Sequence, residues 1–235
     1  MTTIAHNLQS VRERLAAACA ASQRLEEEVT LLAVSKTFGP EAVREAHAAG
    51  QRAFGENYIQ EAVEKMALLA DLALEWHCIG PIQSNKTRLV ATHFDWAHTV
   101  DRLKIAERLA DQRPPERPPL NVCIQVNVDA GATKSGVAPS HAAELARQVA
   151  ALPRLRLRGI MTIPEPAASF EAQLATHREA AALYRALLAD GLPLDTLSMG
   201  MTADLEAAVH AGSTMVRVGT AIFGGRSPKA PISPA

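Results

Sequence analysis

Eight short apolar runs recur along the chain, and a segment of helical character separates each run from the next. The runs span residues 29–36, 52–57, 75–80, 95–100, 120–128, 155–163, 196–200 and 215–220. Strands that alternate with helices are typical of βα units, whose strands pair in parallel. Eight units of roughly 24 residues each predict an α/β fold, a single (β/α)8 TIM-type barrel. An open doubly wound sheet is the alternative, although no GxGxxG motif follows the first run.

Local signals predict where individual helices begin and end. Pro40 suits the first turn of a helix, and Gly50 suits its C-terminal end. Ser140 and Thr202 are predicted N-caps of the helices that follow them, and Gly212 is predicted to end the second of these. An extra N-terminal helix within residues 1–28 is predicted from apolar residues at helical spacing, namely Ile4, Leu8, Val11 and Leu15.

Composition narrows the class of protein. The 235 residues are 48% apolar and 21% charged, which is typical of a globular chain with a sizeable core, and we treat residues 1–235 as one domain. The net charge of −1 offers no basic excess for nucleic acid. Three cysteines without a CxxC pair, no signal sequence and no membrane-length apolar run predict a cytoplasmic protein without a metal site. The aperiodic tail, 226–235, is predicted to be disordered.

The first apolar run ends in a lysine that is a candidate for covalent chemistry. Ser35 and Lys36 end the run, after its apolar residues, where a barrel strand would open into the active-site face. A partly desolvated lysine has a lowered pKa and can form a Schiff base. The alternative is a solvated surface charge, which is the more common role of lysine.

The ends of the last two runs predict a phosphate site. Ser198 and Gly200 end the seventh run, and Gly219 and Thr220 end the eighth, which are the two strands after which barrel enzymes often bind phosphate. Glycine permits close backbone approach, and a short helix after Thr220 would present N–H groups to an anion. The alternative is that these glycines only make tight turns.

Arg217 interrupts the apolar pattern of the eighth run. It alternates with Val216 and Val218, so its side chain faces the opposite side of the strand. If the valines face the helices, Arg217 points into the barrel mouth, beside the predicted phosphate site. A surface ion pair is the alternative.

Several motifs together resemble the pyridoxal phosphate homeostasis protein family (YggS/PROSC-like), whose fold is that of the alanine racemase N-terminal barrel. The matching segments are LLAVSKT (31–37), FGENYIQE (54–61), WHCIGPIQSNK (76–86), QVNV…KSG (125–136), RGIMTI (158–163) and SMGMTADLEAAVHAGSTMVRVGTAIFG (198–224). They cover nearly all of residues 31–224. Four positions depart from the family pattern, namely Phe38 and Gly39, Cys78, and Thr202.

The resemblance implies pyridoxal 5'-phosphate as the cofactor, bound to Lys36 as an internal aldimine. It also implies that Arg217 lies at the pyridine nitrogen and Asn57 beside the ring. The phosphate would be bound by Ser198, Gly219 and Thr220. His77 and Met161 would fall near the pocket, although a satisfied core histidine is the simpler role for His77. Lys86 and Lys134 match lysines that are common in the family, although a solvated surface lysine is the simpler assignment for each.

The resemblance therefore implies a binding protein for intracellular cofactor homeostasis, without catalytic residues, that buffers pyridoxal phosphate or delivers it to apo-enzymes. The alternatives are an amino-acid racemase, a Schiff-base aldolase and a binding module without cofactor. Similar racemases add a second domain and a catalytic tyrosine from a partner subunit, whereas only Tyr58 and Tyr184 occur here. We accordingly expect a non-catalytic monomer with no nucleic-acid or membrane partner.

Overall fold

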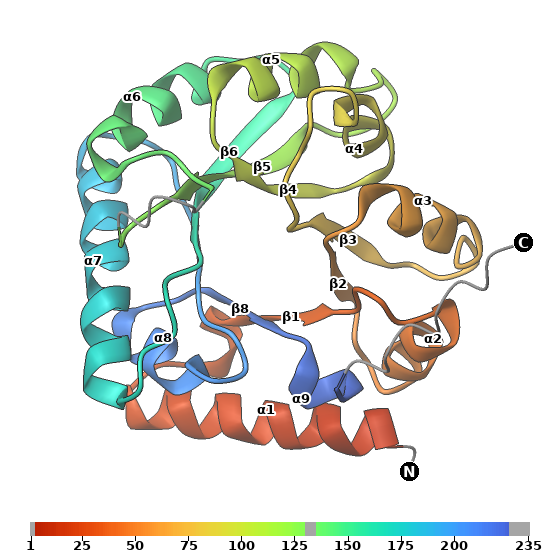
Figure 1. Ribbon diagram of the computed structural model, residues 1–235, viewed down its shortest axis with the longest axis vertical. Helices are drawn as coiled ribbons and strands as arrows, with labels where there is room; N and C mark the ends of the chain where they lie inside the picture. Colours follow the sequence, from red (N-terminus) through yellow and green to blue (C-terminus); the bar gives the residue numbers. More distant parts are fainter. Residues whose placement is uncertain (1–2, 130–134, 226–235) are drawn as a thin grey trace, which may run out of the picture.

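The computed structural model describes residues 3–129 and 135–225, and its centre is a closed barrel of parallel strands (Figure 1). The strands are β1 (Thr30–Val34), β2 (Ala53–Glu56), β3 (Glu75–Cys78), β4 (Trp96–Val100), β5 (Leu120–Val126), β6 (Leu155–Thr162), β7 (Thr196–Ser198) and β8 (Met215–Val218). Each strand pairs with the next, and β8 pairs with β1 to close the ring. Every predicted apolar run contains one of these strands. The (β/α)8 barrel is confirmed, and the open doubly wound sheet is excluded.

Helices surround the barrel and bury their apolar faces against the outside of the strands (Figure 1). After the N-terminal helix α1 (Thr3–Ala21) they are α2 (Pro40–Ala48), α3 (Ile59–Ala67), α4 (Thr87–His93), α5 (Leu103–Gln112), α6 (Pro139–Ala150), α7 (Phe170–Ala189), α8 (Leu205–Ala211) and the short α9 (Thr220–Phe223). Within residues 3–129 and 135–225, no helix is long and apolar enough to cross a membrane. The predicted tail, 226–235, lies outside the described residues.

The N-terminal helix is shorter than the predicted range, 1–28. It ends at Ala21 because Gln23 adopts a left-handed conformation, with φ 56°, and a short 3-10 helix (Glu26–Glu28) follows. Helix α1 packs against α8 and α9. The side-chain amide of Asn7 donates a hydrogen bond of 3.0 Å to the carbonyl oxygen of Ile222 in α9. The extra helix therefore supports the segment that follows β8.

Two predicted helix starts need correction. Helix α6 begins at Pro139, before Ser140, because proline is already set for the first turn of a helix and Ala138 takes the N-cap position. Helix α8 begins after Asp204 and not after Thr202, since the Asp204 carboxylate accepts from the amide of Met201 and organises the intervening turn. The predicted ends are confirmed: Gly50 and Gly212 have φ of 90° and 104°, which glycine adopts without strain.

The two faces of the strands carry different side chains. Outward-facing residues such as Val216 and Val218 join the main core between strands and helices. Small apolar clusters that are separate from this core include Leu32 with Met215 and Trp96 with Met161. Polar residues of the strands occupy the remaining interior of the barrel, and they connect to the site described next.

Candidate functional site

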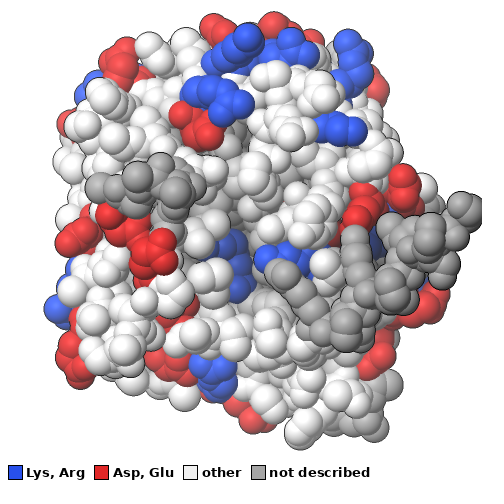
Figure 2. All heavy atoms as spheres, viewed as in Figure 1, with Lys and Arg blue, Asp and Glu red and all other residues white. Residues whose placement is uncertain are grey.

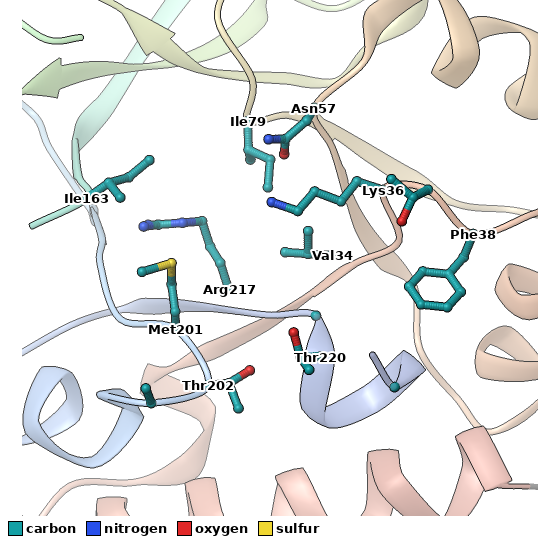
Figure 3. Close-up of a pocket in the computed structure, with 14 residues that line it drawn as sticks. Val34, Lys36, Phe38, Asn57, Ile79, Ile163, Met201, Thr202, Arg217 and Thr220 are labelled. Atoms are coloured by element: carbon teal, nitrogen blue, oxygen red, sulfur yellow. The ribbon is translucent and has the colours of Figure 1, made fainter. Parts of the chain in front are cut away.

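A cavity of about 300 Å³ opens at the C-terminal ends of β1, β2 and β8, which is the size of a small-molecule site. The predicted site residues that line it are Lys36, Asn57, Arg217, Gly219 and Thr220 (Figure 3). Figure 2 shows basic side chains near the centre of the viewed face, while acidic groups lie mainly toward the periphery. The barrel therefore brings together five residues from three segments that are widely separated in sequence.

Lys36 lies two residues beyond β1, where the chain turns sharply into α2. The turn places Thr37 in the left-handed region, with φ 69°, which is uncommon for a residue with a branched side chain. The Lys36 side chain extends across the mouth of the barrel, and its amine points toward Arg217 (Figure 3). The sequence prediction that this lysine faces the site and not bulk solvent agrees with this placement.

Asn57 follows β2 and carries an unsatisfied polar atom. Its Oδ1 is buried and has no hydrogen-bond partner among the described residues. Gly80 allows the backbone of Asn57 to pack closely against it, because a Cβ at Gly80 would overlap the Asn57 carbonyl oxygen. Buried polar groups are almost always paired, so an orphaned oxygen at the edge of a cavity indicates a place for a ligand donor.

Arg217 points into the barrel and is only 4% exposed, which excludes the surface ion pair. Its Nη1 donates to Ser198 Oγ at 2.9 Å, and its Nη2 donates to the carbonyl oxygen of Thr162 at 2.8 Å. Burial lowers the pKa of Arg217 to about 10, so the guanidinium remains a cation at neutral pH. A fixed cation therefore stands at the floor of the cavity.

Ser198 does not line the cavity, contrary to its predicted place at the phosphate. Its side chain is fully buried, and its hydroxyl contacts His98 and Arg217 beneath the cavity floor. The last residue of β7 faces the barrel interior, and the chain after it reaches the cavity at Met201, Thr202 and Ala203. Gly200 makes this turn possible, because its φ is 93° and any larger residue would place a Cβ against the side chain of Ala208.

The remaining candidates lie elsewhere. His77 and Met161 are fully buried inside the barrel and do not line the cavity. Both ring nitrogens of His77 have partners, as expected of a satisfied core histidine. Lys86 caps α4 and its amine lies 3.3 Å from Oε1 of Gln60. Lys134 lies outside the described residues.

Sequence reasoning missed the apolar walls of the cavity. Phe38, Ile79, Ile163 and Met201 line it together with the polar residues. Phe38 packs on Phe223 of α9, with ring centroids 5.2 Å apart. Each wall residue lies one to four positions after the end of a strand, which is the signal that could have identified it. In the part of the chain that the structure describes, no group of three or more His, Cys, Asp or Glu side chains could hold a metal ion.

Comparisons with known proteins agree with this architecture. A family model described as the alanine racemase N-terminal domain matches residues 1–227. A protein from Pseudomonas aeruginosa named pyridoxal phosphate homeostasis protein is 59% identical over 233 residues, covering 99% of this chain and 100% of the relative. The protein of the same name from Escherichia coli is 56% identical over 229 residues, covering 96% and 98%.

Solved structures share the fold. PipY from Synechococcus elongatus, solved with pyridoxal phosphate bound, matches with a TM-score of 0.82 and 38% identity over 94% of this chain and 100% of PipY. An alanine racemase from Clostridium difficile matches with a TM-score of 0.73 at 16% identity, over 97% of this chain but 58% of the racemase, and so shows the fold alone. The chain belongs to the pyridoxal phosphate homeostasis protein family, whose barrel is that of the alanine racemase N-terminal domain.

Proposed function

We propose that this protein binds pyridoxal 5'-phosphate through Lys36 and serves cofactor homeostasis by holding the cofactor and releasing it to acceptor enzymes. One observation carries the proposal: the Lys36 amine, the Arg217 cation and the unsatisfied Asn57 oxygen converge on one cavity of about 300 Å³. The names of the curated relatives and the ligand of PipY support the same cofactor.

The cavity suits the chemistry of this cofactor. Pyridoxal phosphate carries an aldehyde, which condenses reversibly with a primary amine, and it also carries a phosphate dianion. Lys36 is the one lysine among the described lining residues, so it would hold the aldehyde end. Thr220 and Thr202 offer hydroxyl donors for the phosphate, and Gly219 leaves room for a close backbone approach.

Arg217 would face the pyridine nitrogen. A guanidinium can only donate hydrogen bonds, so it favours an unprotonated ring nitrogen and weakens the ring as an electron sink. Ser198 would act beneath Arg217, as a positioning residue, and not at the phosphate. Asn57 would lie beside the ring, with its unsatisfied Oδ1 toward a donor of the ligand.

The site favours holding the cofactor over amino-acid catalysis. Racemisation needs proton donors and acceptors on both faces of the reacting carbon. Among the described residues that line the cavity, Lys36 and Arg217 are the titratable ones, and no tyrosine, histidine or carboxylate opposes Lys36. Tyr58 is exposed and lies outside this lining, and Tyr184 lies in α7. A racemase is therefore the weaker proposal.

Borohydride reduction followed by peptide mapping tests the assignment. The purified protein is loaded with pyridoxal phosphate, reduced and digested, and we expect the pyridoxyl label on Lys36. The Lys36→Ala variant should lose the visible absorption of the bound cofactor, whereas the matched Lys86→Ala variant should keep it. A label on Lys65 or Lys86 with Lys36 unmodified would overturn the proposal.

A further inference from the structure

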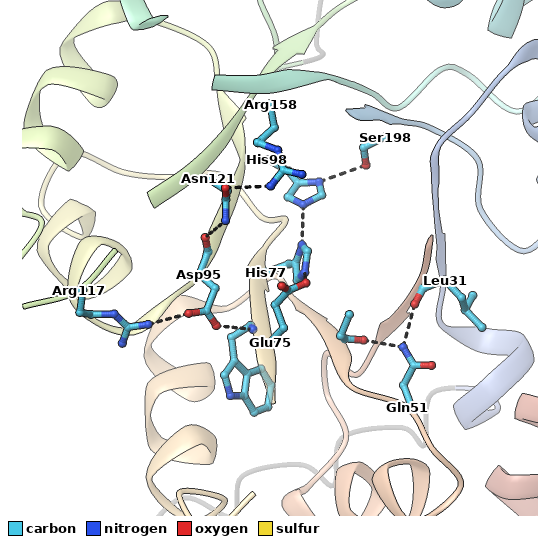
Figure 4. A network of polar contacts seen from close by, with 12 residues as sticks. Leu31, Gln51, Glu75, His77, Asp95, His98, Arg117, Asn121, Arg158 and Ser198 are labelled. Carbon is cyan, nitrogen blue, oxygen red and sulfur yellow. Dashed lines mark hydrogen bonds and ion pairs between the residues drawn. The ribbon is translucent and has the colours of Figure 1, made fainter. Parts of the chain in front are cut away.

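A chain of hydrogen bonds runs through the barrel from the cavity toward the opposite face. Figure 4 shows its part from Ser198 to Glu75. From Arg217 Nη1 it passes to Ser198 Oγ at 2.9 Å, and from Ser198 Oγ to His98 Nδ1 at 3.1 Å. It continues from His98 Nε2 to His77 Nδ1 at 2.9 Å and from His77 Nε2 to Glu75 Oε1 at 2.7 Å. The link between His98 and Ser198 joins residues 100 positions apart.

The end groups impose a direction on this chain. The Glu75 carboxylate can only accept, so His77 must donate through Nε2 and, when neutral, accept through Nδ1. His98 must then donate through Nε2 and accept through Nδ1, which requires the Ser198 hydroxyl as its donor. The oxygen of Ser198 is left to accept from Arg217, a group that can only donate. Every bond therefore points from Arg217 toward Glu75.

The two ends of the chain face different environments. Arg217 lines the cofactor cavity, while the Glu75 side chain is 49% exposed at the beginning of β3. Glu75 lines a second cavity, of about 630 Å³, among residues that precede or begin their strands, such as Arg52 and Asp95. The two cavities lie at opposite ends of the barrel, and the links between them are fully buried side chains, those of His77, His98 and Ser198.

The surroundings of the histidines keep them uncharged. Burial lowers the pKa of His77, and it lowers that of His98 well below the ordinary value. Repulsion from His77, when that ring is protonated, and from the Arg217 cation lowers the pKa of His98 further. Glu75 and Asp95 oppose this effect at His77, and Arg158 assists it. Arg158 comes from β6 and lies over the Trp96 ring, which stacks on His77. Cys123 of β5 is neutral, since burial raises its pKa to about 12.

We propose that Glu75, His77, His98 and Ser198 are positioning residues, which hold Arg217 at the cavity and couple its position to protonation of the histidine pair. The coupling to cofactor retention rests on the proposed function. One proton added at Nδ1 of His98 converts that nitrogen from acceptor to donor. The Ser198 hydroxyl hydrogen must then turn away, and two cations face each other across one oxygen atom. Acidification therefore disfavours the arrangement that holds Arg217.

Nitrogen NMR of the histidine rings tests the chain without cofactor. In the apo protein at neutral pH we expect both His77 and His98 to be neutral, with the proton on Nε2 in each. His141, exposed on α6, provides a reference in the same spectrum. A charged ring at neutral pH, or protons on Nδ1, would overturn the proposed direction of the chain.

Cofactor affinity as a function of pH tests the coupling. His98→Leu removes the bonds to Ser198 and His77 and should weaken affinity by up to about tenfold, the net value of one hydrogen bond between neutral groups. His98→Gln offers a similarly spaced acceptor and donor that do not titrate, so it should restore affinity and flatten its decline at acid pH. Glu75→Gln, at the far end of the hydrogen-bond chain, should reduce cofactor affinity by less than His98→Leu. The exposed control Glu144→Gln should leave cofactor affinity unchanged.

The two possible failures are distinguishable. If His98→Gln and wild type share the same pH profile, or if Glu75→Gln equals Glu144→Gln, the coupling is wrong even though the cofactor binds. If the cofactor does not bind through Lys36, the proposed function is wrong, and the NMR experiment alone decides whether the hydrogen-bond chain exists.

Discussion

The ammonium of Lys65 lies 2.6 Å from Oε1 of Glu56, and both side chains are buried directly behind the residue that precedes Lys36. The same carboxylate oxygen accepts from the Ser35 hydroxyl at 2.6 Å, and Lys65 also donates to the Ser35 carbonyl oxygen at 3.0 Å. Burial raises the pKa of Glu56, and Lys65 counteracts that effect. This ion pair fixes the backbone from which the Lys36 side chain extends.

Removal of one member of this pair should destabilise the fold strongly. Lys65→Met leaves a buried carboxylate without its cation, for which we expect a loss of about 3–5 kcal/mol in the free energy of unfolding. The double variant Lys65→Met/Glu56→Gln should lose less, because no charge remains unpaired. Urea denaturation measures both. The idea is wrong if Lys65→Met is no more harmful than Arg44→Met, which breaks an exposed pair with Asp71.

The two threonines of the cavity should contribute to phosphate binding. Thr220→Val and Thr202→Val each remove a hydroxyl that could donate to a charged acceptor, so affinity for pyridoxal phosphate should fall about ten- to a hundredfold. Equilibrium dialysis or absorption titration measures the change. Thr176→Val in α7, outside the cavity lining, is the matched control. Unchanged affinity in the Thr220/Thr202 double variant would place the phosphate elsewhere.

Gly80 should be required for the position of Asn57. Alanine at this position would drive its Cβ into the Asn57 carbonyl group, so the loop after β2 must move. We expect Gly80→Ala to weaken cofactor binding, measured by the same titration. Gly39→Ala is the control, because a Cβ there meets nothing within 4 Å. Equal affinities in the two variants would contradict this role.

Stability should fall in mild acid. His77 and His98 have lowered pKa values in the folded state, so the unfolded chain binds more protons below its ordinary histidine pKa of about 6.5. The free energy of unfolding should therefore be highest above that pH and decrease as pH falls through it toward the folded pKa values. Urea midpoints between about pH 7 and pH 5 measure this decrease. The His98→Gln variant should show a shallower decrease, while the exposed His141→Gln should parallel wild type.

The loaded protein should transfer its cofactor and not turn over amino acids. With no acid or base opposite Lys36 among the described lining residues, we expect negligible interconversion of D- and L-amino acids by chiral chromatography. We expect reactivation of a cofactor-free enzyme when a scavenger of free aldehyde is present. Racemisation that disappears in Lys36→Ala would instead favour the racemase.

The strand positions were predictable because their signal is local. A buried strand is a short apolar run, and each run between residues 29 and 220 contains one. Lys36 and Arg217 were predictable for the same reason. Lys36 is the charged residue that ends the first run, and Arg217 interrupts the apolar pattern of the last run. Helix starts were less predictable, since Pro139 and Asp204 compete with neighbouring Ser140 and Thr202 for similar roles.

The interior of the barrel was not predictable from spacing. Ser198 ends a strand, as a phosphate ligand would, but the tilt and register of β7 direct its hydroxyl inward to His98 and Arg217. The bond between Ser198 and His98 depends on ring closure by the intervening units. The sequence near Glu56 also does not indicate that Lys65, on the next helix, donates a hydrogen bond to the carbonyl oxygen of Ser35.

The bond between Asn7 and Ile222 has a consequence for the order in which the protein matures. Lys36 leaves the ribosome early, whereas Arg217, Gly219 and Thr220 emerge near the end of translation. Helix α1 can form its hydrogen bond to α9 only after these residues have emerged. The edge of β1 that pairs with β8 also stays unpaired until β8 has been made. A nascent chain that has already exposed Lys36 therefore still lacks Arg217, Gly219 and Thr220, and its cavity is incomplete. If the cofactor binds in this cavity, as proposed, only a chain whose translation is complete can retain it.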